Sequence, residues 1–204
     1  INGIIGEYST SFKGSSSERI ENIRLSSKAI KGGPIMPGQT VSFNDATGPR
    51  SKNAGYKEAN VILKGEFVPS TGGGVCQTST TLYNALLRAN VTIVERTHHS
   101  IPIKYAPLGQ DAAVSYGALD LKFRNDFDFP IYIDSKIIGD RVYMYIYGDK
   151  NAKNYNIGIE SEIIEVVPAE DEIIVDKNLA PGTKELAKRG RDGYKVNTYK
   201  SIIR

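Results

Sequence analysis

Residues 71–84, TGGGVCQTSTTLYN, place three glycines directly before a run that is typical of a helix start. Cys76, the only cysteine of the chain, falls in the first turn of that predicted helix. The N–H groups at a helix N-terminus are unpaired and the helix dipole is positive there, so both favour a thiolate over a thiol. Gly73 and Gly74 let a substrate approach the main chain closely. The stretch therefore predicts a nucleophilic cysteine.

The place of Cys76 on the predicted helix bears on whether it reacts or packs. A free cysteine commonly behaves as a small buried hydrophobe. At about 100° per residue, however, five apolar residues fall on one stripe and Cys76 lies about 120° from its centre. The stripe consists of Val75, Leu82, Ala85, Leu86 and Ala89. The geometry favours the reactive role, and the packing role stays open.

Two adjacent histidines, His98 and His99, are the only ones in the chain. They follow residues 91–94, VTIV, which alternate as a strand leaving the same helix. A strand that runs back along the helix brings its end beside the helix N-terminus. A thiol beside an imidazole is the minimum apparatus for nucleophilic acyl transfer. We therefore expect a cysteine–histidine site.

A third group normally orients the imidazole in such a site. Asp111 and Asp120 are the candidates, because both lie in segments with strand-like alternation soon after the histidines. Asp111 is preferred to Asp120, and the alternative for either is an ordinary turn or sheet-edge carboxylate, the commoner explanation of any single Asp. Arg96 is a candidate to pair with a substrate carboxylate or to form a structural ion pair.

An oxyanion site is also predicted at the start of the helix. The main-chain N–H groups of Val75, Cys76 or Gln77 point out of the first turn, beside Gly73 and Gly74, and are placed to stabilise an oxyanion.

Several short motifs resemble a known family. They are GGGVCQTSTTLYNA at 72–85, Glu95-Arg96, His99-Ser100, Pro107-Leu108-Gly109 and Asp111-Ala112. From about residue 5 to about 150 the chain is similar to the VanW domain of Gram-positive cell-envelope proteins, a family named after vancomycin-resistance gene clusters. The family places its histidine directly before a serine, which selects His99 over His98. Relatives often carry His-Asn where this chain has Thr97-His98.

The resemblance implies an activity. Some VanW proteins are linked to L,D-transpeptidation of peptidoglycan with the motif cysteine as nucleophile, so we expect an enzyme that forms 3–3 cross-links through a thioester on Cys76 and releases D-alanine. Donor and acceptor stem peptides would be its partners, and no cofactor is needed. The alternatives are a cysteine peptidase or carboxypeptidase acting on stem peptides, and a non-catalytic module that binds peptidoglycan or a glycopeptide.

Composition narrows the function classes. The 204 residues carry a net charge of +3, which is too weak to indicate nucleic-acid binding and is compatible with an anionic cell wall. One cysteine excludes an intrachain disulfide, and two histidines with one cysteine lack the spacing of a metal site. No run of ~18 apolar residues is present. With the resemblance, this suggests an extracellular protein of the cell wall or of the outer face of the cytoplasmic membrane, anchored only by a segment outside this chain.

The overall pattern predicts an α+β fold, with two main helices packed on a mostly antiparallel sheet, cysteine at a helix N-terminus and histidine on an adjacent strand. The hairpin signal is strongest between 131 and 148, around Gly139-Asp140. Residues 48–65 are interpreted as a flap over the site or a passive surface loop. We divide the chain into a VanW-like catalytic domain, 1–150, and a small all-β module, 151–204, that resembles a "G-five" domain.

Overall fold

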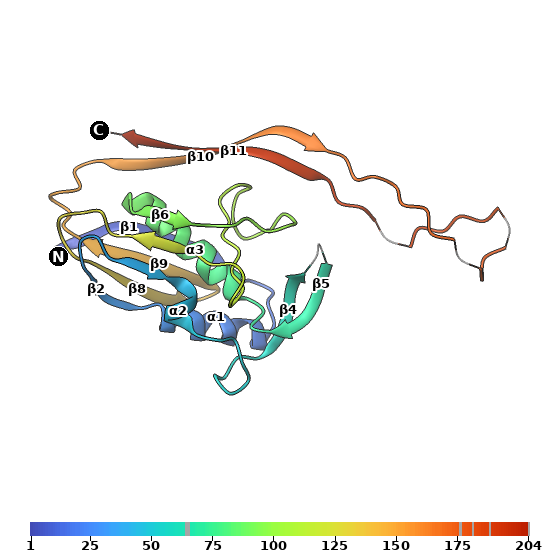
Figure 1. The fold of residues 1–204 in the computed structure, drawn as a ribbon, viewed down its shortest axis with the longest axis horizontal. Coiled ribbons are helices and arrows are strands. Elements are labelled where there is room, and N and C mark those ends of the chain that lie inside the picture. Colours follow the sequence, from blue (N-terminus) through green and yellow to red (C-terminus); the bar gives the residue numbers. More distant parts are fainter. Residues whose placement is uncertain (64–65, 176, 181, 188, 204) are drawn as a thin grey trace.

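Two helices pack on one face of a four-stranded antiparallel sheet in the computed structural model of the chain, which describes residues 1–63, 66–175, 177–180, 182–187 and 189–203 (Figure 1). The sheet has the order β1–β9–β8–β2, formed by β1 at Gly3–Ser11, β9 at Arg141–Gly148, β8 at Ile131–Ile138 and β2 at Gly32–Ile35. The helices are α1, Ser17–Ala29, and α3, Val75–Ala89. The general α+β class predicted from the sequence agrees with this arrangement.

The hairpin of β8 and β9 follows from a period of two in the sequence. Val142, Met144 and Ile146 are fully buried beneath the helices. The residues that alternate with them place tyrosines on the opposite face, where the rings of Tyr143 and Tyr145 stack with centroids 6.1 Å apart. The predicted hairpin is therefore confirmed, because alternation of this kind can bury only one face of a sheet.

Helix α1 begins where the sequence offers a cap. The side chain of Ser16 accepts a hydrogen bond from the N–H of Arg19, which satisfies one of the free donors of the first turn. Ile23 is fully buried in the core. The helix thereby presents its apolar side to the sheet and to α3.

Helix α3 is buried on nearly every side. The predicted apolar stripe lies in the core, and Gly6 of β1 allows the closest approach, since a Cβ there would lie 2.4 Å from the N atom of Ala89. Its polar residues are buried as well, because each finds a partner: Thr81, for example, shares a 2.7 Å hydrogen bond with Thr10. This central helix therefore fixes the position of its own N-terminus firmly.

Smaller elements complete the N-terminal part of the chain. A three-stranded sheet joins β3 (Thr40–Ser42), β7 (Lys122–Arg124) and β6 (Thr92–Glu95), next to the short helix α2 (Phe43–Thr47); a separate hairpin pairs β4 (Glu58–Leu63) with β5 (Glu66–Thr71). The predicted flap at 48–65 thus ends in the first strand of this hairpin, and its residues 64–65 lie outside the described residues.

Two strand predictions near the histidines were wrong. The segment from Asp111 to Tyr116 makes only the isolated bridges Ala113–Thr97 and Ser115–Leu119, in place of a strand. His99, expected on a strand, lies in the loop that follows β6. Its main-chain N–H donates to the Asp111 side chain, so the backbone here is paired by a carboxylate and not by a neighbouring strand.

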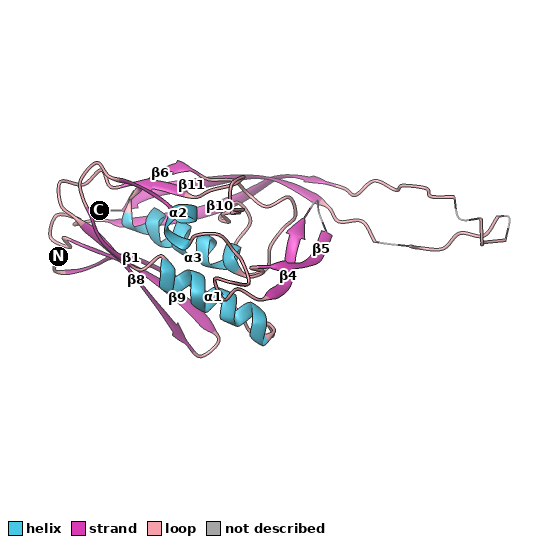
Figure 2. Ribbon diagram, turned by 60° about the horizontal axis from the view of Figure 1, so that its bottom comes forward, coloured by secondary structure: helices cyan, strands magenta, loops and turns pink. Residues whose placement is uncertain are grey.

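The C-terminal part forms a two-stranded ribbon, β10 (Asn156–Val167) and β11 (Gly193–Ile203), that lies over α3, while residues between the two strands run far away from the body (Figure 2). The amide of Gln110 donates to Ser161 Oγ at 3.0 Å, and Lys200 Nζ donates to Asn90 Oδ1 at 2.9 Å. The ribbon therefore leans on the N-terminal part, as expected for so small a module.

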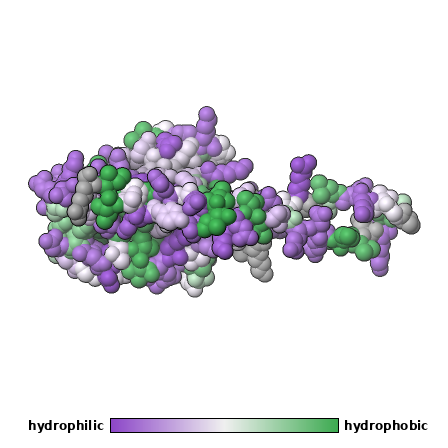
Figure 3. All heavy atoms as spheres, turned by 90° about the horizontal axis from the view of Figure 1, so that it is seen from above, coloured by the Kyte–Doolittle hydropathy of each residue, from purple (hydrophilic) through white to green (hydrophobic). Residues whose placement is uncertain are grey.

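Large hydrophobic side chains are exposed along both strands of the ribbon, and Figure 3 shows apolar patches among mostly hydrophilic atoms. They include Ile163, Ile164, Val166, Val167, Ile202 and Ile203, each about half exposed. Within the described residues, none of the helices has the length and apolar character needed to cross a membrane.

Candidate active site

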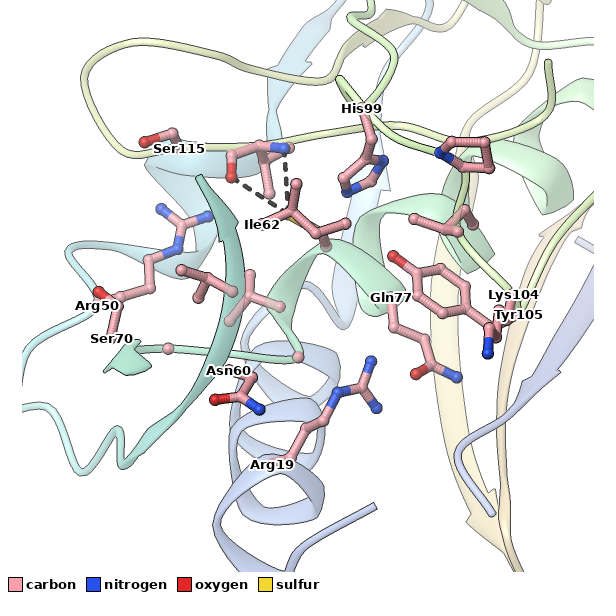
Figure 4. Close-up of a pocket in the computed structure, with 18 of the residues that line it drawn as sticks. Arg19, Arg50, Asn60, Ile62, Ser70, Gln77, His99, Lys104, Tyr105 and Ser115 are labelled. Carbon is pink, nitrogen blue, oxygen red and sulfur yellow. Dashed lines mark hydrogen bonds between the residues drawn. The ribbon is translucent and has the colours of Figure 1, made fainter. Parts of the chain in front are cut away.

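Cys76 lies in the first turn of α3, just after Gly74, which takes a positive φ of 111° at the N-cap. Its Sγ is within hydrogen-bonding distance of the Val114 main chain, 3.4 Å from the carbonyl O and 3.5 Å from the N. The thiol opens onto a cavity of about 1210 Å³ (Figure 4). Cys76 is therefore placed as a nucleophile requires, held by main chain and open to a large cavity.

His99 and Asp111 meet at the cavity wall beside Cys76. The Nδ1 atom of His99 lies 2.6 Å from Oδ2 of Asp111, and the His99 main-chain N–H donates to the same oxygen at 2.7 Å. The other ring nitrogen, Nε2, stays free of Asp111, and His99 and Cys76, which both line the cavity, interact electrostatically. Only 6% of the His99 side chain is exposed, so its ring is held by its surroundings. The three residues form a cysteine–histidine–aspartate triad.

The triad is assembled by an extended segment, residues 110–114, that runs along α3. Every second residue binds the helix: Gln110 O accepts from Asn84 at 2.7 Å, Ala112 N donates to Thr80 Oγ1 at 3.0 Å, and Val114 reaches Cys76 as described. The alternate residues face the other way, toward the segment that carries His99: Asp111 holds His99, and Ala113 N donates to Thr97 O at 2.8 Å. The segment thus joins helix and histidine loop.

Arg96 supports the aspartate. Its Nη2 lies 3.0 Å from Asp111 Oδ1, and the same guanidinium donates to the carbonyl oxygens of Asp111 and Gly109. The ring of Tyr83 lies against it, 5.3 Å from the guanidinium carbon. Of the two roles considered for Arg96, the structure places it in the internal ion pair, where it positions Asp111.

The charges of the triad are mutually dependent. Burial raises the pKa of the Cys76 thiol, but the hydrogen bond and positive charge of His99 outweigh it and hold that pKa below its usual value. Burial lowers the pKa of His99, whereas Asp111 and Cys76 raise it more, to about 9. The thiolate of Cys76 and the imidazolium of His99 therefore stabilise each other.

Two other predicted residues lie away from the thiol. His98 is exposed, and its Nδ1 lies 2.8 Å from the carbonyl oxygen of His99. Asp120 is buried and accepts from the N–H groups of Asn44 and Leu121 and from the Ser42 hydroxyl. Asp120 thus fixes the start of α2 and has a structural role, not a role beside the imidazole.

The main-chain N–H groups predicted to stabilise an oxyanion differ in whether they already donate a hydrogen bond within the protein. The N–H of Val75 donates to Gly72 O at 3.1 Å, and that of Gln77 donates to Gly74 O at 2.9 Å. The Gln77 amide is turned away into the core, where it donates to Thr10 and Ser11. Among the described residues, the N–H of Cys76 has no acceptor, so it is the group available to an oxyanion.

Gly73, the middle glycine, has a packing role. A Cβ at this position would lie 2.5 Å from the carbonyl oxygen of Ala59 in β4. Its own carbonyl accepts from the amide of Asn22 on α1 at 2.9 Å. The residue thus lets three elements meet directly behind the nucleophile.

Sequence reasoning missed several residues that line the cavity near Cys76: Arg19, Arg50, Lys104, Tyr105 and Val114. Most come from loops whose patterns carry no period. For Arg50 the only sequence signal is its place within the predicted flap, residues 48–65. Over the part of the chain that the structure describes, no group of three or more histidine, cysteine or acidic side chains is placed to hold a metal ion.

Comparison with known proteins identifies the family. The model described as "VanW like protein" matches residues 18–147, and the G5 domain model matches residues 159–204. The chain is 43% identical over 143 residues to the uncharacterized protein YoaR of Bacillus subtilis, covering 70% of this chain and 47% of YoaR. It is 33% identical over 142 residues to the vancomycin B-type resistance protein VanW of Enterococcus faecalis, covering 65% of this chain and 50% of that protein.

The chain thus spans about half the length of these curated relatives. No solved structure matches it. The two domain matches together indicate a cell-envelope-associated protein. Since the family model covers well over half of the residues, this chain belongs to the VanW family.

Proposed function

We propose that this domain is a cysteine-dependent acyltransferase of the cell wall, an L,D-transpeptidase that forms 3–3 cross-links between peptidoglycan stem peptides. The observation that carries the proposal is the 2.6 Å contact between His99 Nδ1 and Asp111 Oδ2, which fixes the imidazole with its other nitrogen toward Cys76. Nucleophile, base and orienting carboxylate in this order are the apparatus of acyl transfer through a thioester.

The first half of the proposed reaction forms the acyl-enzyme. The Cys76 thiolate attacks the carbonyl that joins the third residue of a donor tetrapeptide to its terminal D-alanine. The N–H of Cys76 stabilises the resulting oxyanion. His99 then gives its proton to the amine of the departing D-alanine as the carbon–nitrogen bond breaks, which leaves a thioester on Cys76 and a neutral imidazole.

In the second half the neutral His99 acts as base. The side-chain amine of the third residue of a neighbouring stem attacks the thioester, His99 takes a proton from that amine, and the Cys76 thiolate is released. The product carries a new amide between two third residues, which is the 3–3 cross-link. Water in place of the amine would make the same site a carboxypeptidase.

The test incubates the protein with purified disaccharide-tetrapeptides and follows products by mass spectrometry. The expected products are cross-linked dimers with loss of D-alanine, abolished in Cys76→Ala and His99→Gln. His98→Gln is the matched control, because this exposed ring lies outside the triad, and it should leave the rate nearly unchanged. Loss of D-alanine without dimers would replace the transpeptidase by a carboxypeptidase, and unchanged tetrapeptide would favour a binding module.

A further inference from the structure

Two arginines beside the candidate nucleophile make no salt bridge within the part of the chain that the structure describes. Arg19 on α1 and Arg50 in the loop before β4 both line the cavity onto which Cys76 opens (Figure 4). Both side chains are only partly exposed. Among the described residues, neither forms a salt bridge with a carboxylate. This distinguishes them from Arg96, whose charge is taken up by Asp111.

The contacts of Arg50 leave one donor group unused. Its Nη1 donates to the carbonyl oxygen of Gly48 at 3.0 Å. Its Nη2 is buried and finds no hydrogen-bond partner within the described part of the chain. The rings of Phe43 and Tyr116 contact the guanidinium, with each ring centre 5.7 Å from the guanidinium carbon. Aromatic faces hold a guanidinium in place but do not neutralise it.

Arg19 is held in a similar way. Its Nη1 donates to the Ser15 hydroxyl at 2.9 Å, and its guanidinium carbon lies 5.9 Å from the centre of the Tyr105 ring. Burial lowers the pKa of both arginines, the charge of Cys76 acts on both of them, and Asp120 acts on Arg50 without forming a salt bridge with it. Withdrawing a guanidinium from water without an anionic partner is costly, so two such groups around one thiol indicate a site that receives its anions from a ligand.

The other charged residues that line the cavity do not supply those anions. Lys104 adds a further positive charge. Asp192, from the segment before β11, uses Oδ1 to accept the N–H of Ala169, and no salt bridge joins it to Arg19 or Arg50. The interior next to Cys76 is therefore positive in balance.

We propose that Arg50 and Arg19 form a carboxylate-binding subsite that selects substrates with carboxylates close to the scissile carbonyl. The inference of an anion site depends only on the two guanidinium groups that form no salt bridge. Its assignment to peptide substrates rests on the proposed function. A stem tetrapeptide fits this chemistry, because its leaving residue ends in a free carboxylate and its acyl part carries others. Guanidinium groups bind carboxylates through paired N–H donors, and Arg50 has such a donor unused.

The experiment compares two alkylating agents of nearly equal shape. Iodoacetate carries a carboxylate, and iodoacetamide carries a neutral amide. In both reactions the thiolate forms a bond between Sγ and carbon and iodide leaves. Because both rate constants are proportional to the same thiolate fraction, that fraction cancels in their ratio. We expect the ratio for the native protein to exceed that of N-acetylcysteine about tenfold, which corresponds to ~1.4 kcal/mol.

Variants assign the effect to the two arginines. Arg50→Gln and Arg19→Gln should each lower the ratio several-fold, whereas Arg50→Lys should retain most of it. Arg124→Gln is the matched control, since Arg124 is exposed and pairs with Asp126. A ratio equal to that of N-acetylcysteine in low salt, or one that neither glutamine variant lowers, would overturn the subsite. The ratio of the two rate constants for the native protein is compared with that of N-acetylcysteine, so the subsite can be tested even if a variant does not fold.

A second measurement separates this proposal from the proposed function. Tetrapeptides with a free C-terminal carboxylate and with a C-terminal carboxamide are compared as donors. An iodoacetate preference that Arg50→Gln removes, without turnover of either peptide, would retain the anion subsite and reject the transpeptidase. Turnover of both peptides at equal kcat/KM, unaffected by Arg50→Gln, would reject the subsite and retain the enzyme.

Discussion

Asp111 binds His99 twice through one oxygen: Oδ2 accepts the main-chain N–H at 2.7 Å and lies 2.6 Å from the ring Nδ1. The first contact fixes where the histidine backbone lies, and the second fixes how its ring is turned. Oδ1 is held by Arg96. A single carboxylate thus determines the position, the orientation and the preferred proton site of the imidazole beside Cys76.

The first prediction concerns the pH dependence of Cys76 alkylation. Because His99 holds the pKa of the thiol below its usual value, iodoacetamide should react with Cys76 faster at neutral pH than with an ordinary thiol, and its rate should fall as the pH drops through that lowered value. His99→Gln removes the imidazolium charge while Cys76 remains buried, so the midpoint of the alkylation rate against pH should move to higher pH. Stopped-flow or mass-spectrometric alkylation rates measure this. Identical midpoints in the two proteins would contradict the ion pair.

Turnover should respond to alkaline pH differently from alkylation. The pKa of His99 is raised to about 9, so the imidazolium is present below that pH and is lost as the pH rises through it. The proposed acylation needs this proton for the leaving amine, whereas alkylation needs only the thiolate. We therefore expect the acylation rate to fall above about pH 9 while alkylation remains fast.

The third prediction concerns Asp111→Asn. An amide cannot balance the imidazolium, so burial should bring the pKa of His99 well below 9, and the thiolate fraction at neutral pH should drop. Turnover should decrease by about 10²-fold or more. Arg96→Lys, which keeps a charge behind Asp111, should cost much less. A His99 pKa measured by NMR that stays near 9 in Asp111→Asn would refute the assigned role of the carboxylate.

The sequence predicts those parts of the fold in which the apolar pattern is local. Alternation around Gly139-Asp140 locates the β8–β9 hairpin, and the stripe on α3 identifies its core face, because burial selects one side of each element. Cys76 stands out by the same reasoning, since it lies off that stripe.

The rest of the site depends on polar contacts between distant segments, which leave no period in the sequence. His99 was expected on a strand, but a carboxylate pairs its backbone in a loop. Asp111 and Asp120 have similar neighbours in the sequence, and only the tertiary structure separates the one beside the imidazole from the one that fixes α2. The sequence places Arg50 only within the predicted flap, and its position beside Cys76 follows only from the folded cavity.

A fourth prediction tests the packing behind the nucleophile. In Gly73→Ala the new Cβ would meet the carbonyl oxygen of Ala59 at 2.5 Å, and backbone atoms cannot move aside cheaply. We expect a loss of ~1–3 kcal/mol in the free energy of unfolding, measured by urea denaturation. Gly193→Ala is the control, because its nearest neighbour would be an ordinary 3.6 Å contact. Equal stability of the two variants would be evidence against this packing.

The last prediction concerns the polar face of α3, which holds the segment that carries Asp111. Thr80→Val removes the hydroxyl that accepts the Ala112 N–H at 3.0 Å, and leaves that buried donor unpaired. The expected cost is ~1–3 kcal/mol of unfolding free energy. The same change loosens the segment between its contacts to Asn84 and Cys76, so iodoacetamide should also react more slowly with the thiol at neutral pH. Thr40→Val, at an exposed position of β3, provides the control and should alter neither quantity. A destabilised Thr80→Val protein whose thiol reacts at the native rate would show that the polar face stabilises the fold without positioning the triad.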